Sequence, residues 1–227
     1  MTVTILEPTE YNFSIANVDF VFFDYYPSPF VEDHARLYTF CDHQLVRESI
    51  YKFRDGKEQS WPTIILQKLL VKEVISLIAS KQIDPKTDNW ALAFPPASSK
   101  DSNTARFKEL TTNICGLFTN LQNSFDHIEI VKEKEPKYIN DKLNPKEHTT
   151  WDLDQDLKFD IDFFKGKNII LFDDVVTTGK TMYDFIIKLK QLEANPVLCL
   201  SMLYTPKVYG ESLFVKKVRV VKDDTKS

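Results

Sequence analysis

The sequence predicts an α/β fold in which a mostly parallel sheet is flanked by helices. Two nearly continuous apolar runs, "NIILF" (168–172) and "PVLCLSMLY" (196–204), are typical of strands that are covered on both faces. Between them, Met182, Phe185 and Leu189 recur at helical spacing, so strand and helix alternate along the chain. This alternation favours a parallel sheet with right-handed crossovers.

The preceding part of the chain predicts further elements of the same kind. An aromatic strand is expected at about 18–25, then a short helix that Gly56 ends, and a long amphipathic helix over 61–80. The run "NWALAFPP" (89–96) predicts a short buried strand stopped by two prolines, and a helix is expected after it, within 102–118.

The remaining segments complete the expected organisation. A strand is predicted at 127–131, followed by a long polar loop, and the final "LFVKKVRVVKDDTKS" alternates apolar and basic residues as an edge strand does. We expect residues 1–60 to form an N-terminal extension that can serve as a hood. Residues 61–227 are expected to form the α/β core with a C-terminal tail.

Composition narrows the class of protein. Of 227 residues, 43% are hydrophobic, which is enough for a sizeable core, and the net charge of −4 gives no general attraction for nucleic acid. Three scattered cysteines form no C-x-x-C pair and indicate reduced thiols. No segment approaches the roughly 20 apolar residues of a membrane span. We therefore expect a cytoplasmic protein without a membrane partner.

The stretch "IILFDDVVTTGKT" (169–181) contains the candidate site. It includes Gly-Lys-Thr, the end of a P-loop, but Asp174 stands where a P-loop needs its first glycine, and a carboxylate there would repel a triphosphate. In an open parallel sheet, ligands bind at the carboxyl ends of strands. The strand expected to end at Phe172 delivers Asp173 and Asp174 to that edge.

The turn after the two acids suits a single phosphate group. Thr177, Thr178, Gly179, Lys180 and Thr181 offer hydroxyls, backbone amides and the positive end of a helix. Combined with an acid pair for sugar hydroxyls, this turn describes a site for a phosphorylated ribose. The alternative is that the two acids only cap the following turn, as aspartate often does.

The same stretch closely resembles the 5-phosphoribosyl-1-pyrophosphate (PRPP) motif of type I phosphoribosyltransferases. Four apolar residues, two acids, two apolar residues and T-T-G-x-T occur in register. The resemblance implies the type I phosphoribosyltransferase fold, with a mostly parallel sheet and a small variable hood. It also implies that Asp173 and Asp174 bind the ribose hydroxyls, that residues 177–181 bind the 5′-phosphate, and that Mg²⁺ binds with PRPP.

Two further segments resemble the ComF-like group of this family, which is associated with DNA uptake in bacteria. They are "ESIYKFRDGKE" (48–58) and "LAFPPASSKDSNTARFKEL" (92–110), and Thr177 also fits this group or the orotate phosphoribosyltransferases. The chain lacks an N-terminal cysteine zinc module and the glycine usual between Arg106 and Phe107. It resembles a ComF-like or divergent type I member.

The resemblance implies a second site in the loop after the strand at 89–96, where the family binds pyrophosphate. Ser98, Ser99, Lys100 and Arg106 could bind it through hydroxyl and cationic donors. An ordinary solvated loop before a capped helix explains the same residues equally well. The charged loop over 132–150 could close over the ligand to exclude water.

The leading expectation for function is phosphoribosyl transfer from PRPP to a nitrogenous base or amine, with release of pyrophosphate. Such a reaction depends on positioning and charge neutralisation more than on a covalent residue, so no catalytic residue is assigned. The alternatives are a non-catalytic PRPP-binding or nucleotide-binding regulator and a DNA-uptake-associated ComF-like protein. A homodimer is compatible with each of them.

Overall fold

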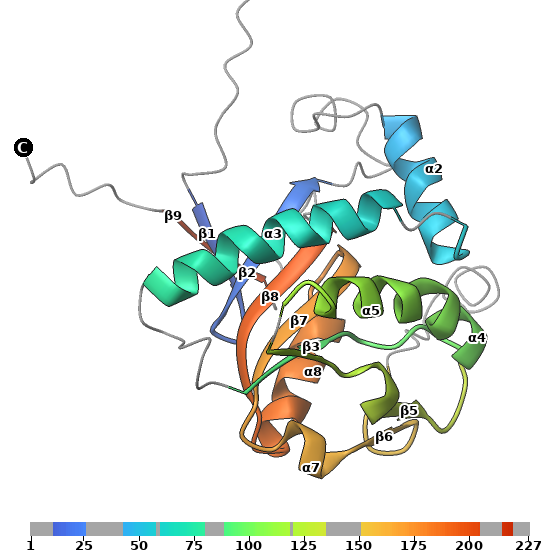
Figure 1. Ribbon diagram of the computed structural model, residues 1–227, viewed down its shortest axis with the longest axis vertical. Helices are drawn as coiled ribbons and strands as arrows, with labels where there is room; N and C mark the ends of the chain where they lie inside the picture. Colours follow the sequence, from blue (N-terminus) through green and yellow to red (C-terminus); the bar gives the residue numbers. More distant parts are fainter. Residues whose placement is uncertain are drawn as a thin grey trace, which may run out of the picture.

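The computed structural model describes residues 11–25, 43–57, 60–79, 89–118, 120–134, 151–204 and 215–219. In these ranges the chain forms a seven-stranded sheet with helices on both faces, together with a separate two-stranded sheet (Figure 1). The α/β class and the mostly parallel, helix-flanked sheet expected from the sequence are therefore confirmed.

The seven-stranded sheet has the order β4-β3-β7-β8-β2-β1-β9. Its first five strands are parallel, and β1 and β9 add antiparallel pairs at one edge. Both β1 and β2 come from the expected N-terminal extension. The bounds are β1 Tyr11–Ile15, β2 Val18–Tyr25, β3 Trp90–Ala93, β4 Leu121–Asn123, β7 Asn168–Val176, β8 Asn195–Tyr204 and β9 Val215–Arg219.

Helices cover the sheet in two layers. In Figure 1, α3 and α5 cross in front of the sheet and α8 lies behind it. The helical elements are α2 His43–Arg54, α3 Ser60–Ala79, α4 Lys100–Asn103, the π-helical turn η2 Thr104–Lys108, α5 Glu109–Cys115, the 3₁₀ turn η3 Phe125–His127, α7 Ile161–Phe164 and α8 Lys180–Gln191. The short helix before Gly56 and the long helix after it agree with the sequence-based expectation.

Alternate residues of the central strands enter two different cores. In β3, Trp90 and Leu92 contact the core built by α2, α3 and α5, whereas Ala91 and Ala93 contact the core built by α8. The same alternation continues along β7, because successive side chains of a strand point to opposite faces. Coverage of both faces explains why these strands are continuous apolar runs in the sequence.

The chain leaves β3 and β7 towards opposite faces of the sheet. After β3 it passes through α4, η2 and α5 to β4 on one side, and after β7 it passes through α8 to β8 on the other. Because β3 and β7 are neighbours, the loops at their carboxyl ends diverge from adjacent points. Such a topological switch point is where open α/β sheets bind ligands.

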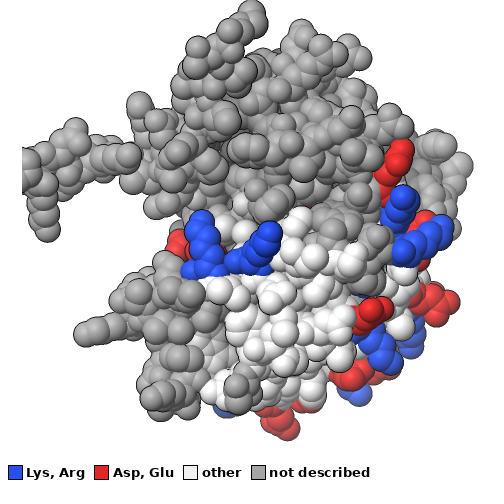
Figure 2. Space-filling model, turned by 45° about the horizontal axis from the view of Figure 1, so that its top comes forward, with Lys and Arg blue, Asp and Glu red and all other residues white. Residues whose placement is uncertain are grey.

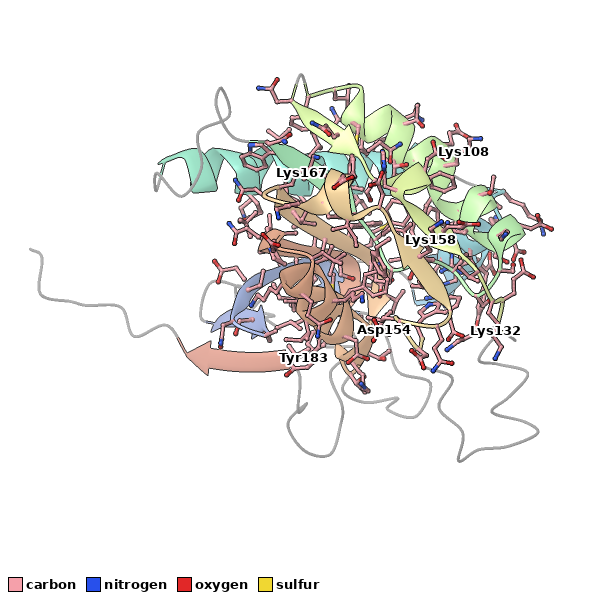
Figure 3. All side chains as sticks on the ribbon, turned by 90° about the horizontal axis from the view of Figure 1, so that it is seen from below. Lys108, Lys132, Asp154, Lys158, Lys167 and Tyr183 are labelled. Atoms are coloured by element: carbon pink, nitrogen blue, oxygen red, sulfur yellow. The ribbon has the colours of Figure 1, made fainter. Side chains whose placement is uncertain are left out.

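The small sheet pairs β5 Ile128–Ile130 with β6 Leu157–Phe159 in antiparallel register. The sequence predicts β5 but places β6 in a long loop, and residues 135–150 of that loop lie outside the described residues. Figure 3 shows Lys132, just beyond β5, and Lys158 on β6, and both are exposed. Lys188 of α8 forms an ion pair with Asp154, just before β6. The small sheet is thereby connected to a helix that covers the main sheet.

The described surface carries charges of both signs. Figure 2 shows one face of the molecule, on which acidic and basic side chains are interspersed. Among the described helices, none is long and apolar enough to cross a bilayer.

Candidate functional site

The two acids lie within β7 rather than after it. The strand expected to end at Phe172 continues to Val176, because it stays paired with β8 in the register Asp173↔Ser201 and Val176↔Tyr204. On its other side, β3 pairs with β7 only as far as Leu171. The acids therefore occupy the part of β7 that extends beyond β3, at the switch point.

Asp174 is a buried carboxylate held by arginine. Its side chain is 2% exposed. Arg54 donates from Nε to Oδ2 at 2.6 Å and from its second terminal nitrogen to Oδ1 at 3.0 Å. The backbone amide of Val175 also donates to Oδ1, at 2.8 Å. A terminal nitrogen of Arg106 lies 3.8 Å from Oδ2, which makes an ion pair but is too long for a hydrogen bond.

Arg54 reaches Asp174 because the end of α2 packs closely on the π-helical turn η2. Gly56 has φ +71°, and a Cβ at this position would lie 2.9 Å from the Cβ of Ala105. Glycine therefore both ends the helix and allows the two backbones to approach. Next to this contact, the rings of Phe53 and Phe107 meet edge to face with centroids 6.2 Å apart.

The π-helical turn places Arg106 at the same carboxylate. Such turns are rare and often occur at functional sites, because an extra residue changes the direction of the side chains. Here Phe107 is fully buried and stacks on Phe94 with centroids 4.5 Å apart, while the Arg106 side chain, 19% exposed, approaches Asp174. Arg106, which the resemblance assigns to a pyrophosphate loop, thus joins the acid pair.

The two acids have opposite shifts in pKa. Burial raises the pKa of Asp173, and the neighbouring Asp174 carboxylate raises it further. Burial acts in the same sense on Asp174, but the charges of Arg54 and Arg106 outweigh it and hold the pKa of Asp174 well below its usual range. The pair therefore favours one ionised carboxylate, Asp174, beside a carboxyl group that retains its proton more readily.

The turn at residues 177–181 has the geometry of an anion site. Gly179 has φ +78° and precedes the first turn of α8, a conformation that favours glycine. The Thr178 hydroxyl accepts from the backbone amide of Lys180 at 3.3 Å. The amide of Thr181 lies in the first turn, where the helix has no carbonyl to accept from it. The helix dipole adds a positive end here.

The ammonium group of Lys180 bonds to a side chain further along α8. Its Nζ atom lies 2.8 Å from both carboxylate oxygens of Asp184, one turn further into α8. The ammonium group of Lys180 is therefore paired within α8, and its backbone amide donates to the Thr178 hydroxyl. Thr177 is exposed, and Thr178 and Thr181 are half-buried at the mouth of the turn.

The loop after β3 is held by a helix cap and by the stem of the small sheet. Ser99 accepts from the amide of Ser102 at 3.2 Å, which caps α4. The carbonyl of Ser98 accepts from the amide of Lys134 at 2.8 Å, and the amide of Lys100 donates to Glu133 at 2.8 Å. The backbone groups of Ser98 and Lys100 and the hydroxyl of Ser99 are thus engaged within the loop and stem, whereas the Arg106 side chain reaches the acids.

Both ends of the segment between β5 and β6 are attached at this loop. The indole nitrogen of Trp151 donates to the carbonyl of Pro96 at 3.2 Å. Lys134 lies over the Trp151 ring, 4.9 Å from its centroid, and pairs with Asp156 at 2.8 Å. The loop after β3 is therefore fixed from two directions.

The acid pair is compatible with a magnesium ion that arrives with its ligand. Within the described residues, no three His, Cys, Asp or Glu side chains gather to form a metal site. Mg²⁺ bound to a phosphorylated ligand needs no such cluster, because it keeps several waters and takes other oxygens from phosphate. Asp173, half-buried beside the switch point, would be the acid to contact such an ion or its waters, because Arg54 already bonds to Asp174.

Sequence reasoning did not assign Arg54 to the site. Arg54 lies in the segment 48–58 that resembles the ComF-like group, but a basic residue in the last turn of a helix is common and by itself indicates no site. Its partner Asp174 lies 120 residues away in the chain.

No model of a known protein family matches the chain, and no curated protein sequence is significantly similar to it.

Proposed function

We propose that the protein binds a ribose 5-phosphate compound, in the first instance PRPP with Mg²⁺, and transfers its phosphoribosyl group to a nitrogenous base or amine with release of pyrophosphate. One observation carries the proposal. An acid pair and a left-handed glycine turn follow each other at the carboxyl end of β7, at the switch point beside β3. Finer assignment to a ComF-like or divergent type I phosphoribosyltransferase rests on the sequence resemblance.

Each part of the site has a chemical role in this proposal. The hydroxyls and amides of residues 177–181 bind the 5′-phosphate, and the carboxyl groups of Asp173 and Asp174 accept hydrogen bonds from the ribose hydroxyls. Arg106 supplies positive charge near the acids. Bound with the ligand, Mg²⁺ would neutralise charge on the departing pyrophosphate.

The reaction itself needs positioning rather than a nucleophile from the protein. The bond between C1 of the ribose and the pyrophosphate oxygen breaks with its electron pair on the leaving group. A bond from the acceptor nitrogen forms on the opposite face, and the acceptor loses a proton to solvent or a base. A fixed ribose and a neutralised leaving group lower the barrier by orientation and electrostatic stabilisation.

A non-catalytic PRPP-binding regulator is the second candidate. The observation in its favour is the ion pair between Asp174 and Arg54, because it links the acid pair directly to α2. A ligand that competes for Asp174 can release the Arg54 side chain at the end of that helix and so change the surface that α2 offers to a partner. Release of pyrophosphate distinguishes the transferase from the regulator.

The test is calorimetric titration of PRPP with and without Mg²⁺. We expect binding that depends on Mg²⁺ in the wild-type protein and that is lost in the double variant Asp173→Asn/Asp174→Asn. Asp162→Asn, an exposed acid on α7, is the matched control and should bind as the wild type does. Absence of PRPP binding in the folded wild-type protein would contradict the proposal.

A second measurement addresses catalysis. Wild-type protein saturated with PRPP and Mg²⁺ is screened for pyrophosphate release over nucleobases and amines. Release with one acceptor supports the transferase, and the acid-pair variant should not release pyrophosphate with that acceptor. Binding of PRPP without release for any acceptor favours the regulator.

A further inference from the structure

Two guanidinium groups converge on one ionised carboxylate at the acid pair. Arg54 comes from α2 and Arg106 from η2, and both approach Oδ2 of Asp174, at 2.6 Å and 3.8 Å. Asp174 also accepts from the amide of Val175, so its two oxygens already receive three hydrogen bonds. A carboxylate can accept about four, which leaves little capacity for ribose hydroxyls.

Two cations share one carboxylate at this point. Arg54 already bonds to both oxygens of Asp174, and Arg106 lies 3.8 Å from one of them. The cations are also costly to desolvate: burial lowers the pKa of Arg106 from its ordinary value. An additional anion near the two guanidinium groups would therefore be stabilised.

Arg54 is the more exposed of the two cations. Its side chain is 37% exposed and that of Arg106 is 19% exposed. Arg54 also ends its helix just before Gly56, so its side chain can reorient without moving the apolar contact between Phe53 and Phe107. That contact and the close approach of Gly56 to Ala105 already attach α2 to η2. These contacts hold α2 in place, so the ion pair between Arg54 and Asp174 is not needed for that purpose.

We propose that Arg54 is a specificity-determining residue that selects ribose 5-phosphates with a second anionic group at position 1 of the ribose. In the free protein Arg54 forms an ion pair with Asp174. The second anion of a ligand binds the guanidinium of Arg54 instead, and Asp174 is then available to accept hydrogen bonds from the ribose hydroxyls. A ligand without that anion has to displace Arg54 with no compensating partner. This inference rests on the proposed ribose 5-phosphate site.

The test compares two ligands that differ in the second anion. PRPP and ribose 5-phosphate are titrated with Mg²⁺ into the wild type, Arg54→Gln and Lys52→Gln, and the ratio of the two dissociation constants is the readout. Lys52 is exposed on the same helix, so its variant removes an equal charge away from Asp174. Arg54→Gln should reduce the preference for PRPP by about tenfold or more, because PRPP loses a charge-assisted contact while ribose 5-phosphate gains access to Asp174.

A structural role for Arg54 predicts a different result. If Arg54 only shapes the site, both ligands weaken together and the ratio stays at the wild-type value, which would overturn the inference. Arg54→Lys keeps the charge but cannot form two parallel hydrogen bonds, so it should fold even if Arg54→Gln does not. Its ratio of dissociation constants should lie between those of the wild type and Arg54→Gln. A wild type that binds neither ligand overturns the proposed function as well, whereas an unchanged ratio overturns the role of Arg54 alone.

Discussion

The ion pair between Arg54 and Asp174 should contribute measurably to stability. Loss of one partner from a fully buried pair costs about 3–5 kcal/mol, because a charge is left unpaired. Arg54 is 37% exposed and Asp174 2% exposed, and Arg106 remains 3.8 Å away to compensate in part. We therefore expect Arg54→Gln to lower the free energy of unfolding by about 2 kcal/mol, a value discounted from the buried case for solvent screening.

Urea denaturation followed by tryptophan fluorescence measures this change. A double-mutant cycle with Asp174→Asn isolates the interaction, and we expect a coupling energy of about 1–2 kcal/mol. The control cycle uses Lys57 and Asp55, whose side chains are 70% and 58% exposed and whose coupling should stay below about 0.5 kcal/mol. Equal coupling in the two cycles would refute the reasoning that burial of Asp174 makes its pair important.

The difference in the free energy of unfolding between the wild type and Arg54→Gln should depend on pH in a definite direction. The pKa of Asp174 is lowered in the folded protein, so the stability that it contributes is present above its ordinary value of 3.8 and is lost as the pH falls through the folded value. In Arg54→Gln the pKa of Asp174 rises, and protonation relieves its unpaired charge at a higher pH. The difference in stability between wild type and variant should therefore narrow as the solution is acidified.

Three further predictions concern Gly56, Gly179 and Asp173. Gly56→Ala should lower the free energy of unfolding by about 1–3 kcal/mol, because its φ is +71° and the new Cβ would meet Ala105; thermal melting checks this. Gly179→Ala, at φ +78°, should weaken binding of ribose 5-phosphate in calorimetry, since the turn proposed to bind the phosphate is displaced. The raised pKa of Asp173 gives stability that is full below its ordinary value and declines as the pH rises through the folded value. Asp173→Asn should remove that decline in urea denaturation; an unchanged decline would show that another group causes it.

The main elements could be predicted because their periodicity is strong. The continuous apolar runs of β7 and β8 and the helical spacing of Met182, Phe185 and Leu189 specify both type and order. The glycine turn at 179 could also be placed, since a left-handed residue before a helix favours glycine. Strong local signals therefore predict the central strands and the glycine turn.

The missed elements lack such signals. The strands β4 and β6 have three residues each, too few for alternation to be distinguished from a loop. The sequence predicts that β7 ends at Phe172, because two acids are typical of the start of a loop, whereas pairing with β8 continues the strand to Val176. Pairing partners decide these boundaries, and the local sequence does not contain them.

The contact of Arg54 with Asp174 could not be read from either segment alone, and it changes how the site is understood. A buried aspartate in a strand can stay ionised only if positive charge lies beside it, and here that charge comes from α2 and η2. The segment expected as an N-terminal extension thus sets the charge state of the acid pair. It follows that α2, the π-helical turn and the carboxyl end of β7 act as one electrostatic unit, in which a ligand that binds the acids must also compete with Arg54.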